Sequence, residues 1–534
     1  MNAKPNSYDV TPYPRHAFPQ THPDTLATVA TLFGMSPAPI EKCRVLEIGC
    51  GSGGNLMPMA EQLPESTFAG IDSSSRAIHD ARAILDHVDL KNCRFEQLDV
   101  MNLEPGFGEF DYIICHGVFS WVPTVVQHRI LDSCKRHLAP HGVAYVSYNT
   151  YPGWHLRGLI RDVMVYHAAR YDEPAVRLRQ AKALLEFLAQ SVPTKNNAYG
   201  INLKREIELM QKKDDNYLLH DYLEEYNLPI YFHDFAARLR QNGLQYLGES
   251  HISSMWVENF RTDVAKTLRG LTKDLIQCEQ YMDFVRNRLF RQTLICHDYA
   301  KLQRTIQTDR IRQLHVTGHL EPVRPDADLF SSAPVEYKSQ PGRKITLGHP
   351  ITKQGLQILK DRWPANINYA DLLAEAKQRL PAVNAFAAAS AASSPAGTTD
   401  AADETLALDL IAGHLGDFIG FSVRPSAFAH LPGPHPRTGN LTRYEAAHNL
   451  PITNLRHENV PINKVDRLVL EHLDGRDHAA LVEAVLAAVA EGKLTLSTNG
   501  QPIAAGEQQR RFVTEIVNQT LARLAACGVV AGNG

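Results

Sequence analysis

The chain has 534 residues, of which 44% are hydrophobic and 21% charged, which is ordinary for a folded soluble protein. Its formal net charge of −3 gives no overall field toward nucleic acid or an anionic membrane. Eight cysteines lie scattered without C-x-x-C pairs or zinc-like spacing, so we expect reduced thiols, a cytoplasmic compartment and no metal site. We find no apolar span of about 18 residues and no signal-peptide core, and expect no membrane partner.

A strand, a glycine turn and a helix follow one another near residue 50. Val45–Ile48 is a short apolar run that predicts a buried strand. Gly49, Gly51 and Gly53 give a turn in which the backbone can approach a ligand closely. A helix begins near Asn55, so the segment predicts a nucleotide-binding site.

Glu47 decides which nucleotide this turn is expected to bind. The spacing Gly49-x-Gly51-x-x-Gly54 also fits the dinucleotide fingerprint, which is a weak signal by itself. A carboxylate two residues before the first glycine would repel a pyrophosphate. It suits a ligand that carries an ammonium and a sulfonium, and S-adenosylmethionine carries both. S-adenosylmethionine is therefore the predicted cofactor.

Polar residues follow the next strands of the predicted sheet. Thr67–Asp72 is the second strand, and Asp72 lies about twenty residues past the glycines, where a carboxylate can accept both ribose hydroxyls. Asp99 ends the third strand, where it could accept from the adenine amino group, and His116 follows the fourth strand. The predicted cofactor-binding residues are Glu47, Gly49, Cys50, Gly51, Gly53, Asp72, Ser73, Asp99, Val100 and His116.

These motifs carry a family resemblance. The stretch Val45 to Ser147 resembles the class I S-adenosylmethionine-dependent methyltransferases, through its E-x-G-x-G-x-G turn, the acid after strand two and the L-D-V of strand three. Further segments are similar to bacterial methyltransferases with a methyltransferase regulatory domain, a group that includes the rickettsial-type protein lysine methyltransferases. Those segments are S-Y-D at 7–9, P-Y-P at 12–14, T-H-P-D at 21–24, Y-N-T-Y-P-G-W-H at 148–155, Y-L-L-H-D-Y-L-E at 217–224 and Y-F-H-D-F at 231–235.

The fold class implied is α/β, a class I methyltransferase (Rossmann-like) seven-stranded sheet with a helical insertion and C-terminal α+β winged-helix-like modules. The expected parts, in chain order, are a cofactor-binding core over 1–150, a helical insertion or lid over 151–229, and a regulatory-domain region over 230–300 that completes the sheet. A small winged-helix-like module over 301–384, an Ala-rich linker over 385–403 and a C-terminal winged-helix-like module over 404–534 follow.

The acceptor side of the site is expected from residues beyond strands four and five and in the insertion. If the acceptor is a lysine, holding it neutral at pH 7 costs about 4–5 kcal/mol, and an apolar pocket lowers that cost. A nearby His or carboxylate could take the proton, and aromatic faces tolerate a methylated ammonium. The predicted catalytic residues are His116, Tyr151, Trp154 and His220.

The sequence thus predicts a methyltransferase that uses S-adenosylmethionine, and the resemblance implies protein lysine as the acceptor and a protein substrate as the partner. A small-molecule acceptor, and a regulatory protein that binds the cofactor without turnover, remain alternatives. The absence of a D/N-P-P-Y motif after strand four argues against a nucleic-acid substrate. We expect the residues after about 400 to recruit a protein partner, and a chain ending near Thr398 to keep its cofactor affinity.

Overall fold

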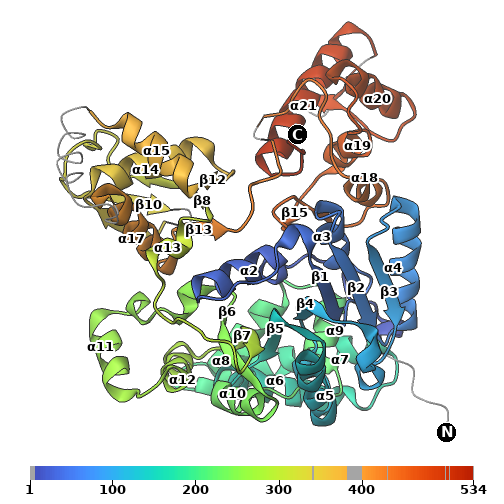
Figure 1. The fold of residues 1–534 in the computed structure, drawn as a ribbon. Helices are drawn as coiled ribbons and strands as arrows, with labels where there is room; N and C mark the ends of the chain where they lie inside the picture. The colour runs from blue at the N-terminus through green and yellow to red at the C-terminus, as the bar shows by residue number, and fades with distance from the viewer. Residues whose placement is uncertain are drawn as a thin grey trace.

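The computed structural model describes residues 7–339, 342–381, 400–429, 431–498, 501–503 and 505–532. A seven-stranded sheet of order β3-β2-β1-β4-β5-β7-β6 forms the centre of the N-terminal domain (Figure 1). Strands β1 to β5 are parallel, and β7 runs antiparallel between β5 and β6. The strands are β1 Arg44–Ile48, β2 Thr67–Asp72, β3 Cys93–Gln97, β4 Phe110–Cys115, β5 Leu138–Asn149, β6 Leu244–Glu249 and β7 Phe290–His297. The predicted fold class is confirmed.

Helices cover both faces of this sheet. Because side chains alternate along a strand, Val45 enters one core with the residues of α2, α3 and α4, whereas Leu46 enters a second core with α5 and α10. A parallel sheet buried on both faces explains why its strands are near-continuous apolar runs in the sequence. These helices are α2 Pro23–Leu32, α3 Leu56–Gln62, α4 Ser75–Val88, α5 Thr124–His137 and α10 Phe232–Gln241.

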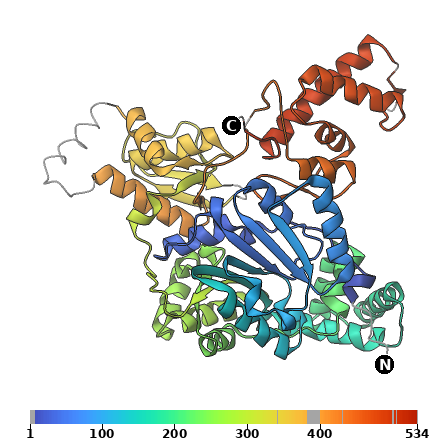
Figure 2. The same ribbon diagram turned by 45° about the vertical axis from the view of Figure 1, so that its right-hand side comes forward.

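Four helices occupy the segment between β5 and α10 and share a hydrophobic core of their own. They lie below the sheet, beside the start of the chain (Figure 2). They are α6 Gly153–Ala168, α7 Pro174–Ser191, α8 Ala198–Met210 and α9 Asp215–Leu223. Two more helices, α11 Thr262–Leu271 and α12 Leu275–Arg286, separate β6 from β7.

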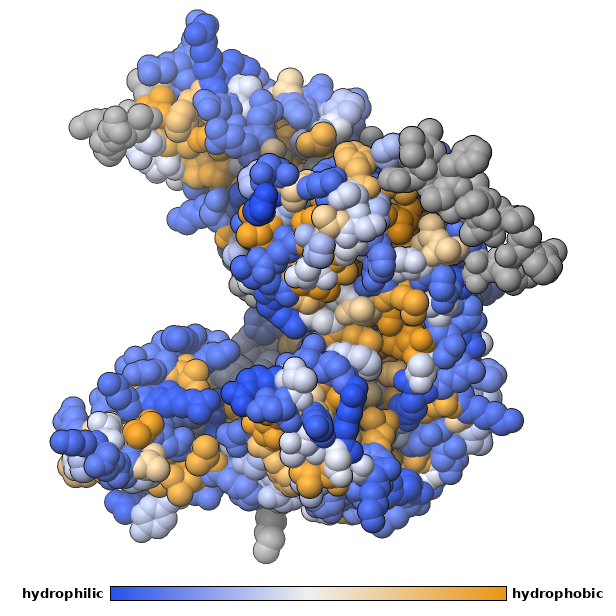
Figure 3. Space-filling view, turned by 90° about the vertical axis from the view of Figure 1, so that its left-hand side faces the viewer, coloured by the Kyte–Doolittle hydropathy of each residue, from blue (hydrophilic) through white to orange (hydrophobic). Residues whose placement is uncertain are grey.

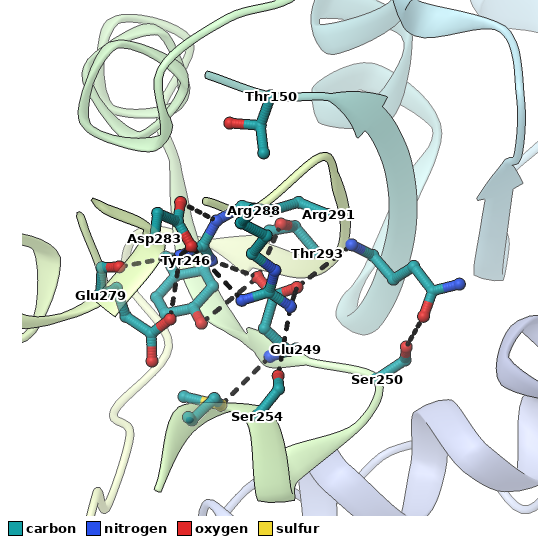
Figure 4. A network of polar contacts seen from close by, with 12 residues as sticks. Thr150, Tyr246, Glu249, Ser250, Ser254, Glu279, Asp283, Arg288, Arg291 and Thr293 are labelled. Atoms are coloured by element: carbon teal, nitrogen blue, oxygen red, sulfur yellow. Dashed lines mark hydrogen bonds and ion pairs between the residues drawn. The ribbon is translucent and has the colours of Figure 1, made fainter. Parts of the chain in front are cut away.

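A buried ion cluster fastens β7 to β6 and α12 (Figure 4). Arg291 donates to Glu249 Oε1 at 2.7 Å, to both carboxylate oxygens of Asp283 at 2.8 and 2.9 Å, and to Glu279 Oε2 at 3.0 Å. Arg288 adds contacts to Glu249 and Asp283 at 3.3 and 3.6 Å. Burial raises the pKa of Glu279 to about 7. The pKa of Glu249 is lowered, because the two arginines outweigh its burial. We call this group the Arg291 cluster.

A middle unit follows the sheet and differs from the expected boundaries. Strand β13 pairs antiparallel with β8, and α17 packs against α14, so elements on both sides of the Ala-rich segment belong to one unit. The expected parts place a division between two modules at 385–403, whereas in the structure the elements on both sides of that segment share one unit. A lack of apolar periodicity indicates a connection but does not say which elements it joins. Residues 385–399 of that segment lie outside the described residues. The unit contains α13 Thr308–Ile311, β8 His315–Gly318, β9 Leu320–Pro322, β10 Val335–Ser339, β11 Lys344–Leu347, α14 Pro350–Arg362, β12 Ile367–Asn368, α15 Tyr369–Arg379, α17 Ala401–Leu415 and β13 Ile419–Ser422.

The C-terminal module after β13 has its own core and combines helices with small hairpins. Figure 3 shows the side of the molecule that carries the middle unit, and its outline is indented at mid-height on the left. Hydrophilic residues cover most of that face, and apolar residues gather in separate patches. The elements are α18 Asn440–Ala447, β14 Ile452–Thr453, β15 Asn459–Val460, α19 Lys464–Glu471, α20 His478–Ala490, β16 Ser497–Thr498, β17 Gln501–Pro502 and α21 Glu507–Ala526.

Candidate active site

The turn after β1 adopts backbone conformations that favour glycine. Gly49, Gly51 and Gly53 have φ values of 77°, 52° and 75°. A Cβ on Gly49 would lie 2.3 Å from Val118, and one on Gly53 would lie 2.5 Å from Phe95. A Cβ on Gly51 would meet no atom within 4 Å. Packing therefore requires the outer two glycines, whereas the space beside Gly51 lets a ligand approach the backbone.

Glu47 is buried at the carboxyl end of β1. Its Oε1 accepts a hydrogen bond from Asn55 Nδ2 at 2.7 Å, and its Oε2 has no partner among the described residues. Burial raises the pKa of Glu47 to about 8, so the carboxyl is largely neutral at pH 7 in this form, which differs from the fixed negative charge assumed from the sequence. A cationic group beside it would favour the ionised form, and an unpartnered buried oxygen is the acceptor that an ammonium requires.

The carboxylates after β2 and β3 have different surroundings. Asp72 Oδ2 accepts from Gly51 N and Oδ1 from Ser74 N, both at 2.9 Å, so this carboxylate joins the ends of β1 and β2. Burial raises the pKa of Asp72. Asp99 is exposed and caps a short helix, because its Oδ1 accepts from Met101 N at 2.9 Å. Both carboxylates lie at the edge where a parallel sheet binds ligands.

The other residues predicted to contact the cofactor differ in how deeply they are buried. Cys50 and Val100 are buried, and Ser73 is exposed directly after Asp72. All eight cysteine thiols are free, and burial raises the pKa of the Cys50 thiol well above its usual value. Cys50 is therefore an apolar wall of the turn and not a nucleophile. Among the described residues, no group of three or more His, Cys, Asp or Glu could hold a metal ion.

The N-terminal segment 9–22 crosses the glycine turn, and we call it the strap. The Asp9 carboxylate accepts from the Ser74 hydroxyl at 2.6 Å, after β2. Further along, the backbone N–H of Phe18 donates to Asn55 Oδ1 at 3.0 Å, after β1. In the sequence these residues contribute to the family resemblance, but no local pattern places them over the site. The available signal was the run of prolines at 12, 14 and 19, which favours an extended chain.

His116 follows β4 and faces two hydroxyl groups. Its Nδ1 lies 3.0 Å from Tyr145 Oη and 3.2 Å from Ser147 Oγ, and its ring lies against Phe18 with centroids 3.9 Å apart. Burial lowers the pKa of His116 to about 4, so the ring is neutral at pH 7 and a poor proton acceptor. Phe290, at the start of β7, meets the His116 ring edge-on at 6.2 Å. His116 is thus a neutral polar group in the wall of the candidate site, and its predicted catalytic and cofactor-binding roles stay predictions.

Tyr151 and Trp154 lie close in sequence but differ in exposure. Tyr151 is half-buried and stacks on His155 with ring centroids 4.1 Å apart. The Trp154 side chain is buried and meets Trp121 edge-on at 6.2 Å. Tyr151 can therefore meet an incoming group directly, whereas Trp154 supports the wall behind it. The assignment of both to an acceptor pocket stays a prediction.

His220 is buried in α9, and both of its ring nitrogens have partners. Nε2 lies 2.9 Å from the Thr11 carbonyl oxygen of the strap, and Nδ1 lies 2.9 Å from Glu224 Oε1. A nitrogen that faces a carbonyl must donate, so Nε2 carries a proton. His220 therefore fastens the strap to the helical insertion, and its catalytic role stays a prediction.

The C-terminal half contacts this site, contrary to the expectation of an independent recruiting module. His457 Nε2 lies 2.8 Å from Asn55 Oδ1, and Glu61 of α3 accepts from Leu441 N at 2.8 Å. In the middle unit, Val423 N donates to the Asp24 carboxylate at 2.8 Å. A chain ending near Thr398 would lose all three contacts. We therefore no longer expect it to keep its cofactor affinity.

Three family models match the chain. A methyltransferase domain matches residues 46–144, a predicted methyltransferase regulatory domain matches 214–297, and a PKMT C-terminal winged helix domain matches 435–529. The fold and the site therefore define a class I S-adenosylmethionine-dependent methyltransferase. Among the described residues, no helix is long and apolar enough to cross a membrane.

Relatives match almost the whole chain. An uncharacterized protein of Rickettsia prowazekii, RP789, is 34% identical over 519 residues, which covers 95% of this chain and 90% of that protein. The structure of PKMT2 from Rickettsia typhi superposes with a TM-score of 0.82 at 30% identity, over 98% of this chain and 100% of that chain. Its complex with AdoHcy gives a TM-score of 0.83 at 29% identity. The chain belongs to the class I S-adenosylmethionine-dependent methyltransferases of the rickettsial PKMT type.

Proposed function

We propose that this methyltransferase transfers methyl groups to lysine side chains of protein substrates. The name of its Rickettsia typhi relative, PKMT2, denotes a protein lysine methyltransferase. The observation that carries the proposal is an exposed set of aromatic rings beside the candidate site, which we call the aromatic surface. It consists of Tyr151, His155, Tyr231, His233, Tyr281 and Phe284.

The rings of the aromatic surface form a continuous chain of contacts. Tyr231 lies 5.2 Å from Tyr151, 5.5 Å from His233 and 6.1 Å from Phe284, measured between ring centroids. Phe284 is 45% exposed and Tyr281 39% exposed, so the outer end faces solvent. Such a contiguous exposed patch is typical of a binding surface, and aromatic faces attract the cationic and aliphatic parts of a lysine.

The inner end of this surface lies near His116. Asn149 at the end of β5 pairs with Phe290 of β7, and Tyr151 follows two residues later. Phe290 is 36% exposed and also meets the His116 ring, so it connects the interior of the site with solvent. Apolar walls here would favour a neutral amine over an ammonium, which is the form that attacks a methyl group. The neutral His116 and the rings would orient that amine and exclude water.

We further propose that Glu47, Asp72 and the backbone of the glycine turn hold the cofactor. Three observations fit a ligand with a cationic amino acid end and a ribose: the unpartnered Glu47 Oε2, the open space beside Gly51 and the Asp72 carboxylate at the strand end. S-adenosylmethionine supplies a methyl group already activated by its sulfonium. Asp99, Ser73, Cys50 and Val100 complete the predicted adenosine side.

Transfer of labelled methyl groups into a cell extract tests the acceptor. We expect label in protein that becomes acid-soluble after protease treatment and maps to lysine. A Tyr281→Ala/Phe284→Ala variant should lower methylation of intact protein about tenfold, the effect of about 1.4 kcal/mol, with unchanged affinity for S-adenosylhomocysteine. Tyr166→Ala is the matched control, because Tyr166 is 74% exposed toward the far end of α6.

Other outcomes would contradict the proposal. Label that stays in a small-molecule fraction without protease would identify a metabolite acceptor. Tight cofactor binding without labelled product in any extract would identify a regulatory protein. Equal losses in the double variant and in Tyr166→Ala would remove the aromatic surface from acceptor binding.

A further inference from the structure

Asn55 is a buried hub that joins three distant parts of the chain. Its Nδ2 donates to Glu47 Oε1 at 2.7 Å and to Thr21 Oγ at 3.0 Å. Its Oδ1 accepts from Phe18 N at 3.0 Å and faces His457 Nε2 at 2.8 Å. The sheet, the strap and the C-terminal module therefore meet at one amide, although His457 is 402 positions from Asn55.

The hydrogen-bond pattern fixes the orientation of the Asn55 amide and the tautomer of His457. The backbone N–H of Phe18 can only donate, so the Asn55 atom that faces it is the oxygen. His457 Nε2 faces the same oxygen and must carry the ring proton. Burial, with a smaller effect of Arg424, lowers the pKa of His457 to about 3, so the ring is a neutral donor throughout the physiological range.

The loop between β14 and β15 presents His457 in a fixed position. His457 has a φ of 61°, which L residues rarely adopt. Asn454 Oδ1 accepts from the backbone N–H groups of Arg456 and Glu458 at 2.9 and 2.8 Å, and its Nδ2 donates to Cys527 O at 2.9 Å. A tight turn that holds a residue in a strained conformation is typical of a functional position.

We infer that His457 is a positioning residue, which acts through Asn55 to hold the Glu47 carboxyl in the orientation that the cofactor's ammonium requires. The C-terminal winged-helix module thereby sets cofactor affinity, in addition to any role in acceptor binding. This inference rests on the proposed role of Glu47. Because such coupling is reciprocal, bound cofactor must also strengthen the contact between the C-terminal module and the residues after the glycine turn.

Calorimetric titration of the full-length protein with S-adenosylhomocysteine tests the inference. His457→Leu removes the donor, and we expect about 3- to 10-fold weaker binding, the range of one lost hydrogen bond. His457→Gln can place an amide N–H near the Nε2 position and should stay within about twofold of wild type. The S-adenosylmethionine KM should rise with His457→Leu while kcat changes little, because the reacting groups are untouched.

Two comparisons separate this role from general loosening of the module. In a Glu47→Gln background, His457→Leu should cause no further loss, since the path through the carboxyl is already broken. Glu61→Gln weakens another contact of the same interface, at Leu441 N, and should leave affinity unchanged. An unchanged affinity of His457→Leu, an additive loss in the double variant, or an equal loss with Glu61→Gln would overturn the inference.

Hydrogen exchange on the wild type provides a test without a variant. S-adenosylhomocysteine should slow exchange in the hairpin 452–460 relative to the paired strands β16 and β17 of the same module. Unchanged exchange in the 452–460 hairpin would contradict the inference even if a His457 variant failed to fold. Because calorimetry and hydrogen exchange follow S-adenosylhomocysteine alone, their outcome is independent of whether the acceptor is a protein lysine.

Discussion

Two buried polar clusters lie at the same sheet and differ in the partners of their carboxyl groups. The Arg291 cluster draws its residues from 249–291 and sets two arginines against three carboxyls. The Asn55 hub draws on the strap, the sheet and the C-terminal module, and no residue of opposite charge faces Glu47 in it. Each cluster leaves one buried carboxyl oxygen without a partner among the described residues, Glu279 Oε1 and Glu47 Oε2, but Glu279 also pairs with Arg291, whereas the only hydrogen-bond partner of the Glu47 carboxyl is the neutral amide of Asn55.

This difference separates a structural cluster from a ligand site. The carboxyls of the Arg291 cluster already face arginines, so losing an arginine destabilises the fold, whereas a further cation would gain little there. A buried carboxyl with a raised pKa and an unpartnered oxygen is unfavourable by itself and becomes favourable when a cation arrives. Changes at Arg291 should therefore alter folding first, and changes around Glu47 and Asp72 should alter cofactor binding first.

Arg291→Met should have the largest effect on stability. The change leaves Glu249, Glu279 and Asp283 buried with only Arg288 to offset them, and removing one partner of such a cluster costs about 3–5 kcal/mol. Denaturant unfolding at pH 7 measures it. Arg288→Met is the control, because Arg288 is 15% exposed and should cost less. Equal losses from both variants would show that the cluster does not depend on its central guanidinium.

Asp72→Ala should weaken S-adenosylhomocysteine binding about 10- to 150-fold, since it removes charge-assisted hydrogen bonds of about 1.5–3 kcal/mol. Calorimetry measures the affinity. Asp111→Ala is the matched control, because the Asp111 carboxylate pairs with Arg44 at the opposite ends of β4 and β1. Unchanged affinity of Asp72→Ala, or tight binding of NAD by the wild type, would contradict the proposed cofactor site.

The cofactor-binding half of the site could be predicted from the sequence because each of its motifs lies within a few residues of a strand end. The glycine turn, Asp72 and Asp99 lie at strand ends that the apolar runs already mark, and β2 has the predicted bounds Thr67–Asp72. Strands β6 and β7 both lie within the region 230–300 that was expected to complete the sheet, although α11 and α12 separate them.

The rest of the site is non-local and could not be read from local patterns. His457 contacts Asn55, which lies 402 positions away in the sequence, and the spacing of apolar residues cannot predict such a contact. The sequence suggested His220 as a catalytic residue but gave no sign of its contacts with Thr11 of the strap, 209 positions away, and with Glu224. The raised pKa of Glu47 was not predicted either, since its cause is burial in the folded protein, which the local sequence does not report.

The last prediction concerns the pH dependence of cofactor affinity, and its effect is the smallest of the three. Burial raises the pKa of Glu47 to about 8 in the ligand-free protein. A cationic ligand group beside the carboxyl would lower that pKa, so binding below pH 8 must release a proton. Affinity for S-adenosylhomocysteine should therefore rise with pH between about 6.5 and 8, by at most tenfold per pH unit.

A comparison of wild type with Glu47→Gln separates the titration of Glu47 from that of the ligand's amine, because the ligand titrates in the same way in both experiments. The variant should bind more weakly and lose the rise in affinity below pH 8. Without ligand, the raised pKa stabilises the wild type fully below the usual glutamate pKa near 4.5, and that contribution is lost as pH rises through 8. Wild type should accordingly lose stability relative to Glu47→Gln over this range. Parallel pH profiles of affinity and stability in the two proteins would show that Glu47 does not titrate in this range, which would contradict the proton release predicted for cofactor binding.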